Sequence, residues 1–236
     1  VRQLLKTFGI PEAWDWGILH YINIFPALVL IGLFQSLGIW VDKFIFWQSD
    51  LSITAAGITT APKYDSAMFL AFLTALPAVV HFFVKLEAEF SEDFQRFYDE
   101  VFFRASYSDI NVAATSLRQG LFQALNNIIA FQATFTLLCA FFGEDILSFL
   151  GLPVSQVGIF RCGVVGSLFL VLFLFSTVIL LYFDRQREVL FSVTVLLVAN
   201  TLLTFLSIKL GYQFYGFGFA TACLLSILIS LIGLPP

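Results

Sequence analysis

Two pairs of ionisable side chains lie inside long apolar stretches of this 236-residue sequence, where a charge needs a partner. Asp42 and Lys43 are neighbours of opposite sign that can neutralise each other, and Gln35 lies two helical turns before Asp42. His81 and Lys85 are four positions apart and therefore share one face of a helix. Histidine titrates near neutral pH and could relay protons. It could equally bond a neighbouring helix while Lys85 reaches the membrane interface.

Further polar side chains recur in the later apolar stretches. They are Asn126, Asn127, Gln132, Arg161 and Asn200. Amides often bridge transmembrane helices, and small residues such as Gly163 and Ser167 allow two helices to approach closely. Asn200 also shares a helix face with Thr204. Such groups either join helices or together wet a cavity for a polar substrate, and the spacing leaves both interpretations open.

The residue types disfavour several classes of function. The sequence has only two histidines, His20 and His81, and no serine nucleophile elbow or carboxylate pair in a large loop, so catalysis is the weaker interpretation. Phosphate-binding glycine loops and zinc-ligand spacings are missing, and we predict no cofactor and no metal site. The net charge of −4 argues against nucleic acid as a partner. Cys139, Cys162 and Cys223 are expected to be buried thiols that pack among helices.

These polar groups must be positioned by membrane-spanning helices. Hydrophobic residues make up 59% of the sequence and charged residues 12%, far from the balance of a soluble domain. A helix of about 20 apolar residues crosses a hydrocarbon core of about 30 Å. We therefore predict an all-α, multi-pass bundle of six transmembrane helices, with bends at Pro26 and Pro77. The predicted spans are about 18–46, 67–86, 121–142, 157–183, 189–210 and 214–234.

The distribution of lysine and arginine predicts the orientation of the spans. With the N-terminus in the cytoplasm, eight basic residues fall on the cytoplasmic side and four on the other, as the positive-inside rule requires. The eight are Arg2, Lys6, Lys85, Arg96, Arg104, Arg118, Arg185 and Arg187, and the four are Lys43, Lys63, Arg161 and Lys209. Both ends of the chain are therefore expected in the cytoplasm.

The polar segment 87–119 is predicted to hold an amphipathic cytoplasmic helix. Phe90, Phe94, Phe97 and Val101 recur at helical spacing and form one apolar face. The remaining faces carry mostly acidic side chains, which do not attract anionic lipid headgroups. We expect the segment to dock against the protein's own helices or against a cytoplasmic partner. The docking candidates are Glu92, Asp93, Arg96, Asp99 and Glu100.

Two strings in the first hundred residues resemble the second half of the PelG-type exopolysaccharide exporters of bacteria. They are FPALVLIGLFQSLGIWVDKFIFW at Phe25–Trp47 and YDSAMFLAFLTALPAVVHFFVKLEAEFSEDFQRFYDEV at Tyr64–Val101. The later spans are similar to the multidrug/oligosaccharidyl-lipid/polysaccharide (MOP) flippase superfamily. Its members have twelve helices in two six-helix bundles around a central cavity, so the resemblance implies that these spans are helices seven to twelve. The start at Val1 without a methionine likewise leads us to expect a longer protein.

The resemblance implies a function in polysaccharide export. It implies a protein of the bacterial inner membrane that exports the Pel amino-sugar exopolysaccharide, alongside a cytoplasmic glycosyltransferase and membrane subunits of a secretion complex. Two alternatives stay open. One is a membrane scaffold that tethers the polysaccharide synthase without transporting anything, and the other is a flippase for lipid-linked oligosaccharide.

Overall fold

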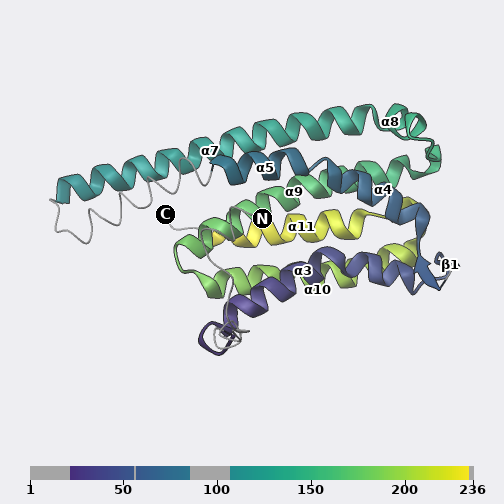
Figure 1. Ribbon diagram of the computed structural model, residues 1–236, viewed down its shortest axis with the longest axis horizontal. Coiled ribbons are helices and arrows are strands. Elements are labelled where there is room, and N and C mark those ends of the chain that lie inside the picture. Colours follow the sequence, from purple (N-terminus) through teal and green to yellow (C-terminus); the bar gives the residue numbers. More distant parts are fainter. Residues whose placement is uncertain (1–21, 56, 86–106, 234–236) are drawn as a thin grey trace, which may run out of the picture.

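The computed structural model describes residues 22–55, 57–85 and 107–233, and helices dominate them (Figure 1). The long helices are α3 (Pro26–Trp47), α4 (Pro62–Leu73), α5 (Leu76–Lys85), α7 (Tyr107–Phe141), α9 (Val157–Tyr182), α10 (Gln186–Leu210) and α11 (Phe217–Ile232). The short elements are β1 (Ile53–Ala55), β2 (Ile58–Thr60), α8 (Gly143–Phe149), η2 (Val154–Gln156) and η3 (Tyr212–Phe214). By length and composition, six helical segments of the described chain could cross a membrane, which confirms the predicted all-α, multi-pass architecture.

The helices pack side by side in an order that differs from their order in the chain. Helix α3 packs against α10, α10 against α11, α11 against α9, and α9 against both α4 and α7. Helices α3 and α7 consequently lie toward opposite edges of the bundle (Figure 1). The β1–β2 hairpin and α8 lie at one end of the bundle, and the turn between α9 and α10 lies at the other (Figure 1).

Prolines set the boundaries of the first two spans. Pro26 and Pro62 are the first residues of α3 and α4, where a missing backbone N–H costs nothing. The second span is divided at Thr74–Ala75 into α4 and α5. Pro77 explains this break, because its ring clashes with the carbonyl of Leu73, four residues earlier, and it offers no N–H to that carbonyl. The structure thus interrupts the helix at both predicted places: residues 22–24 are helical and Phe25 breaks the helix directly before Pro26, and a second break lies near Pro77.

The third spanning helix is longer than its apolar stretch. Helix α7 begins at Tyr107, whereas the sequence pattern predicted a span over 121–142 preceded by a separate segment to residue 119. Its 35 residues correspond to about 52 Å, more than a hydrocarbon core of about 30 Å. A hydropathy pattern shows only the apolar part of a helix. The first residues of α7 are polar, so the pattern placed the start of the helix too far along the chain.

The interior of the bundle holds polar and small side chains within a largely apolar core, while its surface is rich in exposed apolar side chains. Leu137 and Leu202 are 70% and 64% exposed, whereas Ser167 and Asn200 are fully buried. A Cβ added at Gly163 of α9 would lie 2.7 Å from the Cβ of Ala71 in α4, and the Ser167 hydroxyl donates to the Ala71 carbonyl at 3.0 Å. The predicted close approach at Gly163 and Ser167 is therefore confirmed. This distribution is typical of helices packed in lipid.

Candidate functional site

Asp42 and Lys43 form a buried ion pair near the hairpin end of α3. The Lys43 Nζ lies 3.2 Å from both carboxylate oxygens of Asp42 and donates to the Ile39 carbonyl at 3.3 Å. Asp42 is fully buried and Lys43 is 6% exposed. The Tyr64 hydroxyl of α4 donates to Asp42 Oδ2 at 2.7 Å. The expected mutual neutralisation is confirmed, and Tyr64 links the pair to a second helix.

Aromatic rings surround the ammonium group of Lys43. Its Nζ lies 4.4 Å from the ring centre of Phe72 in α4, 5.7 Å from that of Phe219 in α11, and 5.4 Å from that of Trp40 in α3. The negative faces of aromatic rings attract a cation, and more strongly where water is excluded. The ammonium is therefore held by a carboxylate and by rings from three helices.

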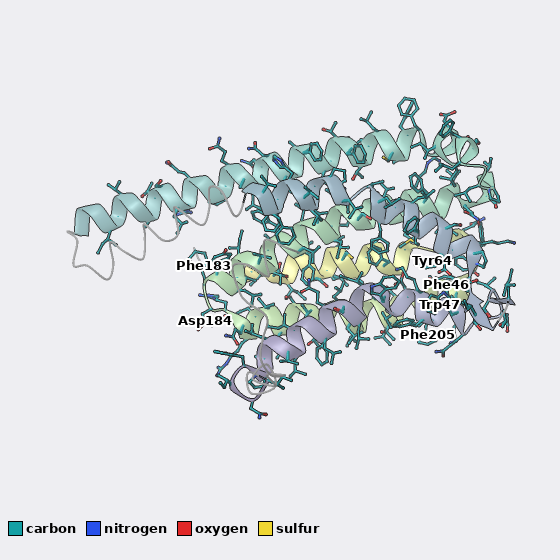
Figure 2. All side chains as sticks on the ribbon, in the orientation of Figure 1. Phe46, Trp47, Tyr64, Phe183, Asp184 and Phe205 are labelled. Carbon is teal, nitrogen blue, oxygen red and sulfur yellow. The ribbon has the colours of Figure 1, made fainter. Side chains whose placement is uncertain are left out.

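A second polar contact joins α3 to α4 beside the ion pair. The indole N–H of Trp47 donates to Asp65 Oδ2 at 2.8 Å, and the same oxygen accepts the backbone N–H of Ala61 at 2.8 Å. The latter bond satisfies an N–H just before α4, as the acidic residue of a capping box does. The Phe46 ring stacks on Tyr64 with 3.7 Å between centroids, so the two helices meet through Phe46, Trp47 and Tyr64 (Figure 2).

Asn200 lies at a different contact, between α10 and α3. Its Nδ2 donates to the Gly38 carbonyl at 2.9 Å, and its Oδ1 accepts the Thr204 hydroxyl at 3.1 Å. A Cβ at Gly38 would lie 3.2 Å from the backbone nitrogen of Leu197, so glycine permits this close approach. The predicted shared face of Asn200 and Thr204 is confirmed. In this structure the amide joins two helices.

Gln132 and Arg161 also bond locally. The Gln132 amide of α7 is fully buried and reaches the Thr74 carbonyl at 3.4 Å, at the break between α4 and α5. Arg161 is exposed near the start of α9, where its Nε donates to the Ala140 carbonyl at 2.8 Å and its Nη2 lies 3.8 Å from Glu144 Oε1. Neither residue contacts Asp42 or Lys43: Gln132 bonds at the break between α4 and α5, and Arg161 contacts α7 and α8.

The other candidates from the sequence are exposed or only partly buried. His81 of α5 is exposed, and its ring lies 6.1 Å from that of Phe131 in α7. Asn126 and Asn127 are exposed on α7, and Gln35 is half-buried on α3. Lys85 is the last residue of α5, and its side chain is outside the described part. The docking candidates lie outside the described residues as well; they are Glu92, Asp93, Arg96, Asp99 and Glu100.

The structure therefore brings together one charged cluster rather than every predicted polar residue. We call Asp42, Lys43 and Tyr64, with the surrounding rings of Phe72 and Phe219, the latch cluster. Tyr64 was missed by the sequence analysis. A hydroxyl just inside the start of a span is a signal that could have found it, but its partner lies 22 residues away on another helix.

Six helical segments of spanning length, an apolar exterior and a buried ion pair define a multi-pass membrane protein. A comparison with family models identifies the family. Residues 1–235 match the family described as "PelG: Putative exopolysaccharide Exporter (EPS-E)", so the chain belongs to the PelG family, which is a family of transporters rather than of enzymes. Neither the search of curated proteins nor that of solved structures found a match.

Proposed function

We propose that this protein exports an amino-sugar exopolysaccharide of the Pel type across the bacterial inner membrane, acting beside a cytoplasmic glycosyltransferase. The observation that carries the proposal is the family match over residues 1–235 in a chain with six spanning segments. The six spans then form one half of a twelve-helix transporter, whose two halves enclose the polymer path.

We further propose that the latch cluster couples export to an ion gradient. A charged pair inside a membrane is costly and usually serves transport. The cluster ties α3 to α4 through the bond from Tyr64 to Asp42, and to α11 through Phe219. Parting α3 from α4 would break that bond. The cluster would therefore respond to a movement of these helices.

The charge distribution supports an orientation with both ends in the cytoplasm. Arg185 precedes α10 and Arg187 lies in its first turn, and Asp184 lies at the opposite end of the bundle from Trp47 and Tyr64 (Figure 2). Arginine is retained on the cytoplasmic side of a membrane. In this orientation the latch cluster lies toward the periplasm, where an exported polymer leaves.

Transport by the full-length protein in proteoliposomes tests the proposal. We expect uptake of labelled Pel oligosaccharide above that of protein-free vesicles when a proton gradient is imposed. Asp42→Asn and Lys43→Met should each lower the rate by about tenfold, because each leaves its buried partner uncompensated. The matched control is Asp50→Asn, which changes an exposed carboxylate in the loop after α3 and should leave the rate unchanged.

The alternative functions predict different results in the same vesicles. A protein that is folded and binds the glycosyltransferase, yet never passes oligosaccharide, would be a scaffold and would contradict export. Uptake of lipid-linked sugar alone would identify a flippase. Uptake that is identical in Asp42→Asn and wild type would remove the latch cluster from the coupling mechanism while leaving export in place.

A further inference from the structure

The second spanning segment consists of two helices, α4 and α5, that meet at Thr74 and Ala75; we call these two residues the junction (Figure 1). The Thr74 N–H donates only three residues back, to the Ala71 carbonyl at 3.1 Å. The Ala75 N–H likewise donates to the Phe72 carbonyl at 3.0 Å. Regular bonding over four residues resumes where the Val79 N–H donates to the Ala75 carbonyl at 3.0 Å. Such tightened turns inside a helix, next to a proline, are places where helices bend.

The helices on the two sides of the junction belong to different apolar clusters. Ala67, Met68 and Ala71 of α4 lie in the main core. Ala78 and Phe82 of α5 lie in a second, smaller cluster together with residues of α7 and α9. A movement of α5 therefore repacks the smaller cluster and leaves the main core in place.

The contacts that hold α4 are directional, whereas those described for α5 are contacts between rings. Helix α4 accepts a hydrogen bond from Ser167 of α9 at 3.0 Å and is tied to α3 through Tyr64. In α5, the Phe82 ring lies 4.7 Å from that of Phe175 in α9. Apolar contacts have no fixed direction, so they can be remade after a shift more easily than hydrogen bonds can.

Gln132 of α7 reaches the junction with an incomplete set of hydrogen bonds. Its Nε2 lies 3.4 Å from the Thr74 carbonyl, which is long for such a bond. Its Oε1 is buried and has no partner among the described residues, and neither has the hydroxyl of Thr136, one turn further along α7. Pro77 also offers no N–H to the Leu73 carbonyl. Unpaired buried groups are costly, so an arrangement that pairs them would offset the loss of the present bond.

We propose that the junction is a hinge about which α5 moves relative to α4, and that Gln132 holds α5 in the position seen here. Helix α4 stays on α9 and α3 while α5 moves, so the bond from Tyr64 to Asp42 is kept. In the proposed orientation α5 is the cytoplasmic half of its span. Its movement then opens and closes the cytoplasmic end of the bundle, a consequence that rests on the proposed function.

Distances between spin labels in the full-length protein test the hinge. The three native cysteines are replaced by alanine, and a label at Leu202→Cys in α10 is paired with one at Val80→Cys in α5 or at Phe69→Cys in α4. Val80 and Phe69 are matched, because they are 60% and 62% exposed and each lies five residues from the junction. We expect two distances, or one broad distribution, for Val80 and a single narrow distance for Phe69. Distributions of equal width would overturn the hinge.

Gln132→Leu tests the residue that holds α5. It removes the bond to the Thr74 carbonyl and keeps a side chain of similar size in the buried position. The ratio of the two Val80 distances should change about two- to tenfold, as expected for one hydrogen bond. Gln123→Leu is the matched control, because it makes the same change at an exposed position of α7. A ratio that is the same in Gln132→Leu as in the wild type would contradict the holding role.

Pro77→Ala relates the hinge to export. An alanine N–H can bond to the Leu73 carbonyl, so the helix continues through the junction and the Val80 distance should become single and narrow. Transport in the proteoliposomes should fall about tenfold, because a required movement is lost. Pro62→Ala, at the first residue of α4, is the control and should change neither measurement.

The two measurements separate the hinge from the proposed function. Full transport by a Pro77→Ala protein with a narrow distance would overturn the role of α5 in opening the bundle. A wild-type protein that transports nothing would instead contradict export, and the spin-label distances would still decide whether α5 moves.

Discussion

At the scale of single residues, the latch cluster satisfies a buried carboxylate with donors from two helices. Asp42 accepts from the Lys43 ammonium and from the Tyr64 hydroxyl, and Lys43 also donates to a backbone carbonyl. Removing one partner of a buried ion pair destabilises a protein more than replacing both partners by apolar residues, because a single charge is then left in apolar surroundings. The Tyr64 hydroxyl also stabilises the Asp42 carboxylate, because a hydrogen bond to a charged acceptor is stronger than one between neutral groups.

Tyr64→Phe should destabilise the protein by about 1.5–3 kcal/mol, the range for a hydrogen bond to a charged group. The ring and its stacking on Phe46 are kept, so the loss reports on the hydroxyl alone. Thermal unfolding in detergent measures the effect. Tyr215→Phe is the matched control, because Tyr215 also contacts Phe46, with 5.0 Å between centroids, but leaves the Asp42 bond intact. Equal shifts in the two variants would contradict a special role for the bond from Tyr64 to Asp42.

At the scale of elements, glycines decide how closely the helices approach. A Cβ at Gly218, the second residue of α11, would lie 2.8 Å from the backbone nitrogen of Thr204 in α10. Backbone cannot move aside as the end of a side chain can. The contact between α10 and α11 therefore depends on the missing side chain, as the contact between α3 and α10 does at Gly38. Close approach strengthens van der Waals packing, which drives helix association in lipid.

Gly218→Ala should lower the stability of the bundle by about 1–3 kcal/mol, because it forces α11 away from α10. Gly158 offers a closely matched control. It is the second residue of α9, and a Cβ added there would have nothing within 4 Å. Gly158→Ala should stabilise by about 0.4–1 kcal/mol through the lower entropy of the unfolded chain. Unfolding temperatures in one detergent compare the pair, and a loss of similar size in both would disprove the packing argument.

At the scale of the whole molecule, the surface suits lipid and the interior holds the hydrogen bonds. Buried hydroxyls and amides such as those of Ser167 and Asn200 bond within the bundle, and the oxygens of Ser230 and Ser176 are 2.7 Å apart. The exposed side chains of α11, and those of α10 between Arg187 and Lys209, are apolar. Helices in lipid gain little from hiding leucine, so packing and interior hydrogen bonds hold the bundle together.

This arrangement predicts that a charged substitution at an exposed position is harmful inside the hydrocarbon core and tolerated outside it. Leu202 of α10 is 64% exposed and Val112 of α7 is 67% exposed. Val112 lies about 44 Å from the end of α7 at Phe141, beyond a core of about 30 Å. Leu202→Lys should reduce the inserted, monodisperse protein sharply, at a cost of about 2.5–3.5 kcal/mol, and Val112→Lys should not. Similar yields of the two variants by size-exclusion chromatography would argue against the lipid boundary described here.

The sequence by itself determined that lipid surrounds most of this protein, that its fold is a bundle of spanning helices, and which family it belongs to. Apolar runs of spanning length are a local property, and lipid permits only a few backbone solutions for them. Local pairings were also predictable, because one helix fixes them: Asp42 lies beside Lys43, and Asn200 lies one turn before Thr204. The hairpin of β1 and β2 was not predicted, and neither was the polar start of α7.

Only the tertiary structure decided which polar groups meet across helices. Asn200 bonds to Gly38, 162 residues earlier, and Ser167 bonds to Ala71, 96 residues earlier. Such partners depend on the spatial order of the helices and on the rotation of each about its axis. Many orders and rotations are compatible with the same six apolar runs, because lipid accepts almost any apolar face. The contacts between particular residues select one of these arrangements, and this selection places Asp42, Lys43 and Tyr64 together.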